Sequence, residues 1–195
     1  MQRNDDTTLK VAMKQPAHQM TATELLEQQP LHVRSELVRG RLRLREPAAY
    51  LHGKLAIAIG AALHTWVAAR QLGDVVGAET GFTLRRNPDT VRAADAAFIS
   101  AGRVPPAGCI GFAELAPDLV VEVLSPSDRP SDVRDNVADW INAGVRLVWL
   151  IDAPRRSAVV HRADGTIDRK TAVDVLDAED VLPGFSVPLR GLFGD

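Results

Sequence analysis

Residues 116–128 read Ala-Pro-Asp-Leu-Val-Val-Glu-Val-Leu-Ser-Pro-Ser-Asp, and this stretch decides the fold. Residues 119–124 are apolar and mostly β-branched apart from one position, with a proline on each side, which is typical of a strand buried on both faces. The exception is Glu122. Because side chains alternate along a strand, Glu122 shares a face with Val120 and Leu124, and a carboxylate between apolar neighbours needs a positive partner. The pattern therefore indicates either a functional glutamate, such as a metal ligand, or a structural glutamate paired with a basic side chain.

The length and composition indicate one domain. The chain has 195 residues, 46% of them hydrophobic, which is enough for one core. A formal net charge of -2 and a pI near 6.2 exclude a generally basic nucleic-acid coat, so any DNA binding must come from a local cluster. We predict a loose tail over residues 1–20 and a single domain over residues 21–195.

The cellular setting follows from one cysteine and from the first twenty residues. A single thiol, Cys109, excludes an internal disulfide and a cysteine zinc cage, which is typical of a cytoplasmic protein. The first twenty residues mix charges and contain no apolar block. We therefore expect neither a signal peptide nor a membrane span.

Hydrophobic periodicity predicts an α/β (α+β) fold with a mixed central sheet flanked by helices. The strand at 119–124 is followed by a helix and then by an apolar segment, an order that predicts a parallel crossover. The expected elements are a hairpin at 35–38 and 41–45 around Arg39 and Gly40, a helix at 50–71, strands at 73–85 and 91–100, a helix from a cap at Ser131 to residue 143, a strand at 145–152, and an edge hairpin at 156–161 and 166–175.

Alternation in the first hairpin creates a basic stripe. Arg41, Arg43 and Arg45 share one face of the predicted strand, and leucines occupy the other. Such a stripe is either a solvated face of the sheet or a surface that contacts phosphates. The sequence leaves both interpretations open.

Two carboxylates on separate predicted strands suggest a reaction. Asp95 lies among alanines and, on its own, fits a capping or turn residue. Asp95 and Glu122 are 27 residues apart (122 minus 95), so adjacent strands could bring them to one end of the sheet. Two such side chains suit Mg²⁺ or Mn²⁺, which could support hydrolysis of a phosphodiester. His52 and His64 point about 120° apart on their helix, which argues against a shared metal, and His52 is the better functional candidate.

Several segments resemble the Uma2 family of putative restriction endonucleases, in the family's order and over about residues 20–193. These segments are Glu36-Leu-Val-Arg-Gly40, the Asp95 strand, residues 116–128, Ala143-Gly-Val145, Trp149-Leu-Ile-Asp152 and Leu182-Pro-Gly-Phe185. The resemblance implies a restriction-endonuclease-like fold of the PD-(D/E)XK type. It also implies that Asp95 and Glu122 hold Mg²⁺ or Mn²⁺ and that Glu36 has a supporting place near the site.

The chain departs from that family at the position of a lysine. The family places this lysine on the helix after the central strand, and Asn136 occupies the slot here. An amide cannot take a proton from water at neutral pH. Arg134, on the same predicted helix, could stabilise charge but could not act as a base.

Two functions from different classes remain open. The first is a Mg²⁺-dependent DNA endonuclease in which Arg41, Arg43, Arg45 and Arg134 contact the nucleic acid, and for this enzyme we expect a homodimer. The second is an inactive relative that binds nucleic acid or a protein, an alternative favoured by Asn136. A purely structural dimerisation domain is a weaker third interpretation.

Overall fold

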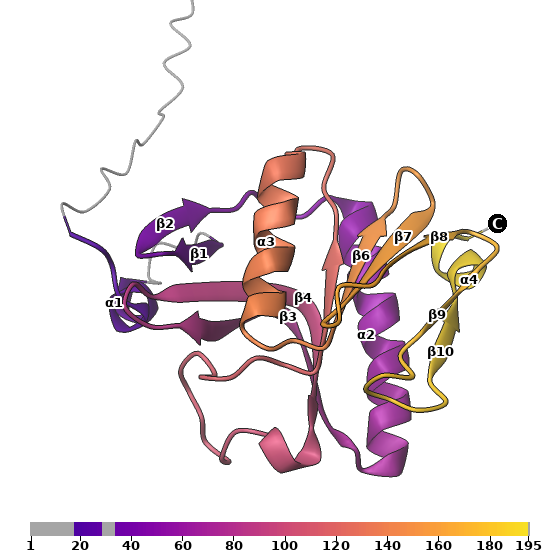
Figure 1. Cartoon of the computed structure of the whole chain (residues 1–195), viewed down its shortest axis with the longest axis horizontal. Helices are drawn as coiled ribbons and strands as arrows, with labels where there is room; N and C mark the ends of the chain where they lie inside the picture. Colours follow the sequence, from indigo (N-terminus) through magenta and orange to yellow (C-terminus); the bar gives the residue numbers. More distant parts are fainter. Residues whose placement is uncertain (1–17, 29–33, 195) are drawn as a thin grey trace, which may run out of the picture.

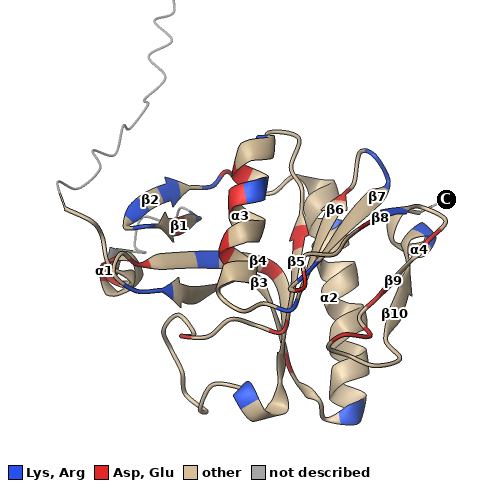
Figure 2. Ribbon diagram, in the orientation of Figure 1, with Lys and Arg blue, Asp and Glu red and all other residues tan. Residues whose placement is uncertain are grey.

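Residues 119–123 of the stretch quoted above form the strand β5, at the centre of a mixed sheet (Figure 1, with β5 labelled in Figure 2). The computed structural model describes residues 18–28 and 34–194, so most of the predicted tail lies outside the described residues. The elements are α1 (Ala22–Gln28), β1 (Ser35–Val38), β2 (Arg41–Leu44), α2 (Tyr50–Arg70), β3 (Gly73–Arg85), β4 (Thr90–Ser100), a 3-10 turn (Ala101–Arg103), β5 (Leu119–Val123), α3 (Pro130–Asn142), β6 (Leu147–Asp152), β7 (Ser157–Arg162), β8 (Ile167–Thr171), β9 (Val175–Asp177), β10 (Ser186–Pro188) and α4 (Leu189–Phe193).

The main sheet runs in the order β2-β1-β4-β5-β6-β7-β8, with β3 paired to β4 outside this path. β5 and β6 are parallel, as the strand, helix, strand order predicts, and the other pairs are antiparallel. The predicted mixed sheet with helices on its faces is therefore confirmed.

Helices cover both faces of this sheet. α2 packs on one face through Leu55, Ile59, Leu63 and Val67, and the end of the chain from β9 to α4 joins it there. α3 packs on the other face through Val137 and Trp140. Because β5 lies between the two layers, its apolar side chains are buried on both sides.

β1 and β5 pair with the same edge of β4 and leave an opening between them. β3 occupies one edge of β4 at both Val91 and Ala96. The other edge pairs with β1 at Val91 and with β5 from Ala96 to Phe98. Residues 92–95 of β4 therefore face the opening, which is hereafter called the fork.

A two-residue turn at Arg39 and Gly40 sets the hairpin of β1 and β2 beside the fork. Arg39 and Gly40 both have positive φ, 51° and 73°, as a tight two-residue hairpin turn requires.

α3 begins at Pro130 and shows no side-chain cap, so the predicted cap at Ser131 is wrong. Proline suits the first helical turn because it has no N–H to satisfy there.

None of the helices in residues 18–28 and 34–194 combines the length and the apolar character needed to span a membrane.

Candidate active site

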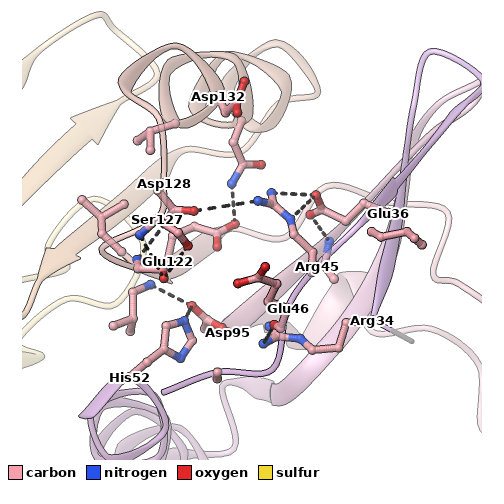
Figure 3. A pocket seen from close by; sticks show the side chains of 18 of the residues that line it. Arg34, Glu36, Arg45, Glu46, His52, Asp95, Glu122, Ser127, Asp128 and Asp132 are labelled. Carbon is pink, nitrogen blue, oxygen red and sulfur yellow. Dashed lines mark hydrogen bonds and ion pairs between the residues drawn. The ribbon is translucent and has the colours of Figure 1, made fainter. Parts of the chain in front are cut away.

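A pocket of about 670 Å³ lies at the fork (Figure 3). β1, β4, β5, the segment after β2 and the N-terminal parts of α2 and α3 all contribute to its walls. In Figure 2, acidic segments of β5 and α3 lie on the side of the fork opposite the basic strand β2. The pocket thus brings acidic and basic side chains from distant parts of the chain together.

Asp95 stands on β4 at the inner end of the fork, with its side chain only 8% exposed. Its Oδ2 accepts a hydrogen bond of 2.7 Å from the backbone N–H of Val123. The same oxygen lies 3.2 Å from Nε2 of His52 on α2. Of the two histidines considered above, His52 therefore lies in the pocket, whereas His64 is exposed.

Glu122 lies beside Asp95 because of the strand register. β4 and β5 pair Ala96 with Val121 and Ala97 with Val120, so the next step of the same register sets Asp95 opposite Glu122. Residues directly opposite each other in an antiparallel pair share a face and lie close together. The structure therefore brings the two predicted carboxylates together.

Two donors from α3 fix one oxygen of Glu122. Oε1 accepts hydrogen bonds of 3.0 Å from Nδ2 of Asn136 and 2.8 Å from Nε1 of Trp140. Burial raises the pKa of Glu122 to about 8, and the negative charges of Asp95 and Glu36 add to the rise. A carboxyl buried in this way favours its neutral form, and a cation bound directly beside it would favour the charged form.

The two carboxylates have the donor chemistry of a hard cation site. Among the described residues, hydrogen bonds reach Oδ2 of Asp95 and Oε1 of Glu122, which leaves one oxygen of each side chain open. Oxygen donors of this kind fit Mg²⁺ or Mn²⁺. The described residues contain no cluster of three or more His, Cys, Asp or Glu side chains around a common metal position. A cation here would therefore take most of its ligands from water or substrate.

Glu36 lies in the pocket but serves as an anchor for two arginines. Its Oε2 accepts from Nη1 of Arg92 at 3.0 Å and from Nε of Arg45 at 3.0 Å, and its Oε1 accepts from the N–H of Ala93 at 3.3 Å. Arg92 also donates to Asp139 on α3 at 2.6 Å. Glu36 therefore links β1 to β4 and, through Arg92, to α3. This is a structural role beside the two carboxylates.

The predicted basic stripe divides in two. Arg41 and Arg43 are exposed on β2, whereas Arg45 follows the end of the strand and turns into the pocket towards Glu36 (Figure 3). Arg134 is exposed on α3 and is not among the residues that line the pocket. Only Arg45 of these four cations lines the pocket itself.

Arg34, which was not among the residues predicted from the sequence, also lines the pocket. Burial lowers the pKa of its guanidinium, and the negative charges of Asp95, Glu36 and Glu122 act in the opposite direction. Arg34 stands two residues before Glu36, and alternation along β1 would have indicated a shared face.

With its mixed sheet flanked by helices, the chain has a restriction-endonuclease-like fold, and acidic side chains of β4 and β5 meet at one end of that sheet. The chain belongs to the Uma2 family, described as putative restriction endonucleases, whose sequence profile matches residues 22–190.

Among solved structures, the chain is similar to a putative nuclease belonging to DUF820 from Anabaena variabilis ATCC 29413. That likeness has 18% sequence identity and a TM-score of 0.77, and it covers 89% of this chain and 97% of the other. At this identity it supports the fold alone. No curated protein matches the chain.

Proposed function

We propose that the protein is a metal-dependent endonuclease of the restriction type that hydrolyses DNA phosphodiester bonds, with Mg²⁺ or Mn²⁺ held by Asp95 and Glu122. The observation that carries the proposal is the pairing of these two carboxylates in one pocket, each with an oxygen open. Family membership as a putative restriction endonuclease supports the same reaction class.

In such a reaction, different residues of the pocket would have different roles. A divalent cation, when bound, supplies a polarised phosphate and a more acidic water. Trp140 and Asn136 orient Glu122 through its Oε1, and the N–H of Val123 orients Asp95. Arg45, held by Glu36, presents a guanidinium that suits a phosphate oxygen. One pocket cuts one strand, so we expect a homodimer wherever both strands are cut.

Plasmid nicking tests the proposal directly. With Mg²⁺ or Mn²⁺ the wild-type protein should convert supercoiled plasmid to nicked circles, and chelation of the metal should stop the conversion. The Asp95→Asn substitution removes a charged ligand, and we expect the rate of nicking to fall by at least about 100-fold. Asp177→Asn, on β9 and outside the pocket, serves as the matched control and should cut at the wild-type rate. Equal cutting by the wild type and Asp95→Asn would refute the assignment of this pocket.

The different positions of Arg43 and Arg45 give a second prediction. Arg45→Met removes the pocket guanidinium, and we expect a drop in kcat/KM of about 10-fold or more. Arg43→Met removes an exposed charge, and we expect weaker DNA binding with a salt slope reduced by about one. Cleavage kinetics for the first variant and binding titrations at several salt concentrations for both variants check this. Identical behaviour of the two variants would show that Arg45 is simply part of the exposed basic surface.

Asn136 in the lysine slot supports one alternative, a relative that binds DNA or a protein without cutting. That protein would bind DNA in a salt-sensitive manner and leave plasmid intact. It would also show no rise in melting temperature with Mg²⁺, since a ligand that binds only the folded state raises it.

A further inference from the structure

Two arginines lie opposite each other at the end of the hairpin of β1 and β2. The register of the hairpin pairs Ser35 with Leu44. One step further along, Arg34 lies opposite Arg45, and the backbone N–H of Arg45 donates to the carbonyl oxygen of Arg34 at 2.8 Å. Residues opposite each other share a face of the hairpin, and both side chains line the pocket (Figure 3). These two residues are hereafter called the arginine pair.

The arginine pair places two like charges side by side. Both guanidinium groups stay charged, because arginine does not lose its proton in proteins. Like charges directly opposite each other destabilise a hairpin. Burial lowers the pKa of Arg34, and the charge of Arg45 lowers it as well. An anion bound by both side chains would remove this repulsion.

Carboxylates near the arginine pair offset only part of its charge. Asp95, Glu36 and Glu122 act against the effect of burial on the pKa of Arg34. Glu36 also serves Arg92, whose Nη1 donates to its Oε2 at 3.0 Å. Burial raises the pKa of Glu122 to about 8, so this side chain is mostly neutral at pH 7. The three carboxylates therefore balance the arginine pair incompletely.

The anchoring of the arginine pair leaves donors directed at a ligand. Nε and Nη2 of Arg45 contact Oε2 of Glu36, at 3.0 Å and 2.7 Å. Nη1 of Arg45 lies 4.0 Å from Oδ1 of Asp128, which is longer than a hydrogen bond. Nη1 of Arg34 donates to the carbonyl oxygen of Glu46 at 3.2 Å. Because a guanidinium has five N–H donors, anchoring contacts of this kind are compatible with a ligand in the pocket.

We propose that Arg34 and Arg45 form a binding site for a phosphate group, separate from the two carboxylates in the same pocket. Two guanidinium groups on one face can each donate to a different non-bridging oxygen of one phosphate. In DNA that group is an internal phosphodiester or a terminal phosphate, and the two share this chemistry. The role of the site towards DNA rests on the proposed function, whereas binding of a free phosphate ion requires no cleavage.

Two small probes test the site and distinguish the sources of the phosphate. Inorganic phosphate stands for a terminal phosphate, and dimethyl phosphate stands for an internal phosphodiester. Binding of each probe is measured by phosphorus NMR in EDTA, at pH 7 and constant ionic strength. Tighter binding of inorganic phosphate would identify the terminal group as the ligand, and tighter binding of dimethyl phosphate would identify the internal one.

Matched variants assign the binding to the arginine pair. Arg34→Met removes one set of charge-assisted hydrogen bonds, and we expect the Kd of the bound probe to rise by about 10-fold or more. Arg34→Lys keeps the charge without the planar fork, so its Kd should lie between the two. Arg155→Met, at an exposed arginine outside the pocket, is the control and should bind as the wild type does.

Melting temperatures separate a ligand site from a purely structural role of Arg34. A ligand that binds the folded state raises its melting temperature, so inorganic phosphate should stabilise the wild type more than Arg34→Met. Phosphate also stabilises folded proteins in general because it is excluded from their surface, and this effect is common to both proteins. If Arg34 is only structural, the difference between the two melting temperatures will be the same with and without phosphate, and the proposal is then overturned.

The binding data also stand apart from the test of cleavage. Failure of both probes to bind the wild type, or equal affinities for the wild type and Arg34→Met, would overturn the phosphate site. If the probes bind as expected but plasmid stays intact, the proposed function falls and the phosphate site remains. If plasmid is cut but Arg34→Met keeps the wild-type affinity, the proposed function remains and the phosphate site falls.

Discussion

The Glu122→Gln variant is expected to be more stable than the wild type when both are free of metal, by an amount that grows with pH. The pKa of Glu122 is raised from its ordinary 4.5 to about 8. Between these values the folded protein keeps a proton that the unfolded chain has lost, so the stability of the wild type falls as pH rises. Glutamine carries no such penalty, and its carbonyl oxygen can still accept from Asn136 and Trp140.

The size of this effect follows from the pKa difference. At about 1.4 kcal/mol for each pKa unit, the gap between 4.5 and about 8 corresponds to at most about 5 kcal/mol above pH 8. Below pH 4.5 the two proteins should have equal stability. Urea unfolding in EDTA at pH values from 4 to 9 measures the difference. A Glu122→Gln variant less stable than the wild type at pH 9 would contradict the prediction.

Added metal should reverse the ranking of the two proteins. Mg²⁺ or Mn²⁺ bound by Asp95 and Glu122 would stabilise the folded wild type by mass action, whereas Glu122→Gln lacks one charged ligand. We expect the melting temperature of the wild type to rise with metal concentration and that of the variant to rise much less. The same titration with Asp177→Asn, outside the pocket, should follow the wild type.

The Arg92→Met substitution is expected to lower the free energy of unfolding by about 3–5 kcal/mol, the usual result of removing one partner from a buried ion pair. The side chain of Arg92 is 5% exposed and lies between Glu36 and Asp139, both partly or fully buried. Without it, Asp139 keeps no recorded ion pair among the described residues, and Glu36 keeps only Arg45. Chemical denaturation measures the loss.

Exposure provides the control for Arg92. Arg155→Met breaks a pair with Asp152 on the surface, where the arginine side chain is 81% exposed, and it should change stability little. Equal effects of the two substitutions would mean that the network around Glu36 contributes no more than a surface pair. Metal titration of Arg92→Met should also show weaker binding, because Arg92 anchors the helix that orients Glu122.

Local sequence patterns predict the elements and the two carboxylates well. Burial on both faces marks β5, and the one interruption in its apolar run is the glutamate of the pocket. The hairpin follows from the dipeptide Arg39-Gly40, and the parallel crossover follows from short connections. These features depend on residues close in sequence, which is why the pattern suffices.

Contacts between distant segments cannot be predicted from such local sequence patterns. Arg92 is 56 residues from Glu36 and 47 from Asp139, and nothing near it in sequence indicates either partner. Alternation grouped Arg45 with the exposed Arg41 and Arg43, but Arg45 stands just beyond the last paired residue of β2. There it lies diagonally across from Glu36, whose direct partner in the hairpin is Arg43.

The pocket draws its walls almost entirely from the part of the chain that precedes β6. Among the described residues from β6 to residue 194, Leu150 alone lines it. The turn at Asp164 and Gly165, which joins β7 and β8, therefore offers an attachment point remote from the chemistry. A fluorescent label or an affinity handle inserted there would leave the side chains of the pocket untouched while binding of DNA, the proposed substrate, is measured.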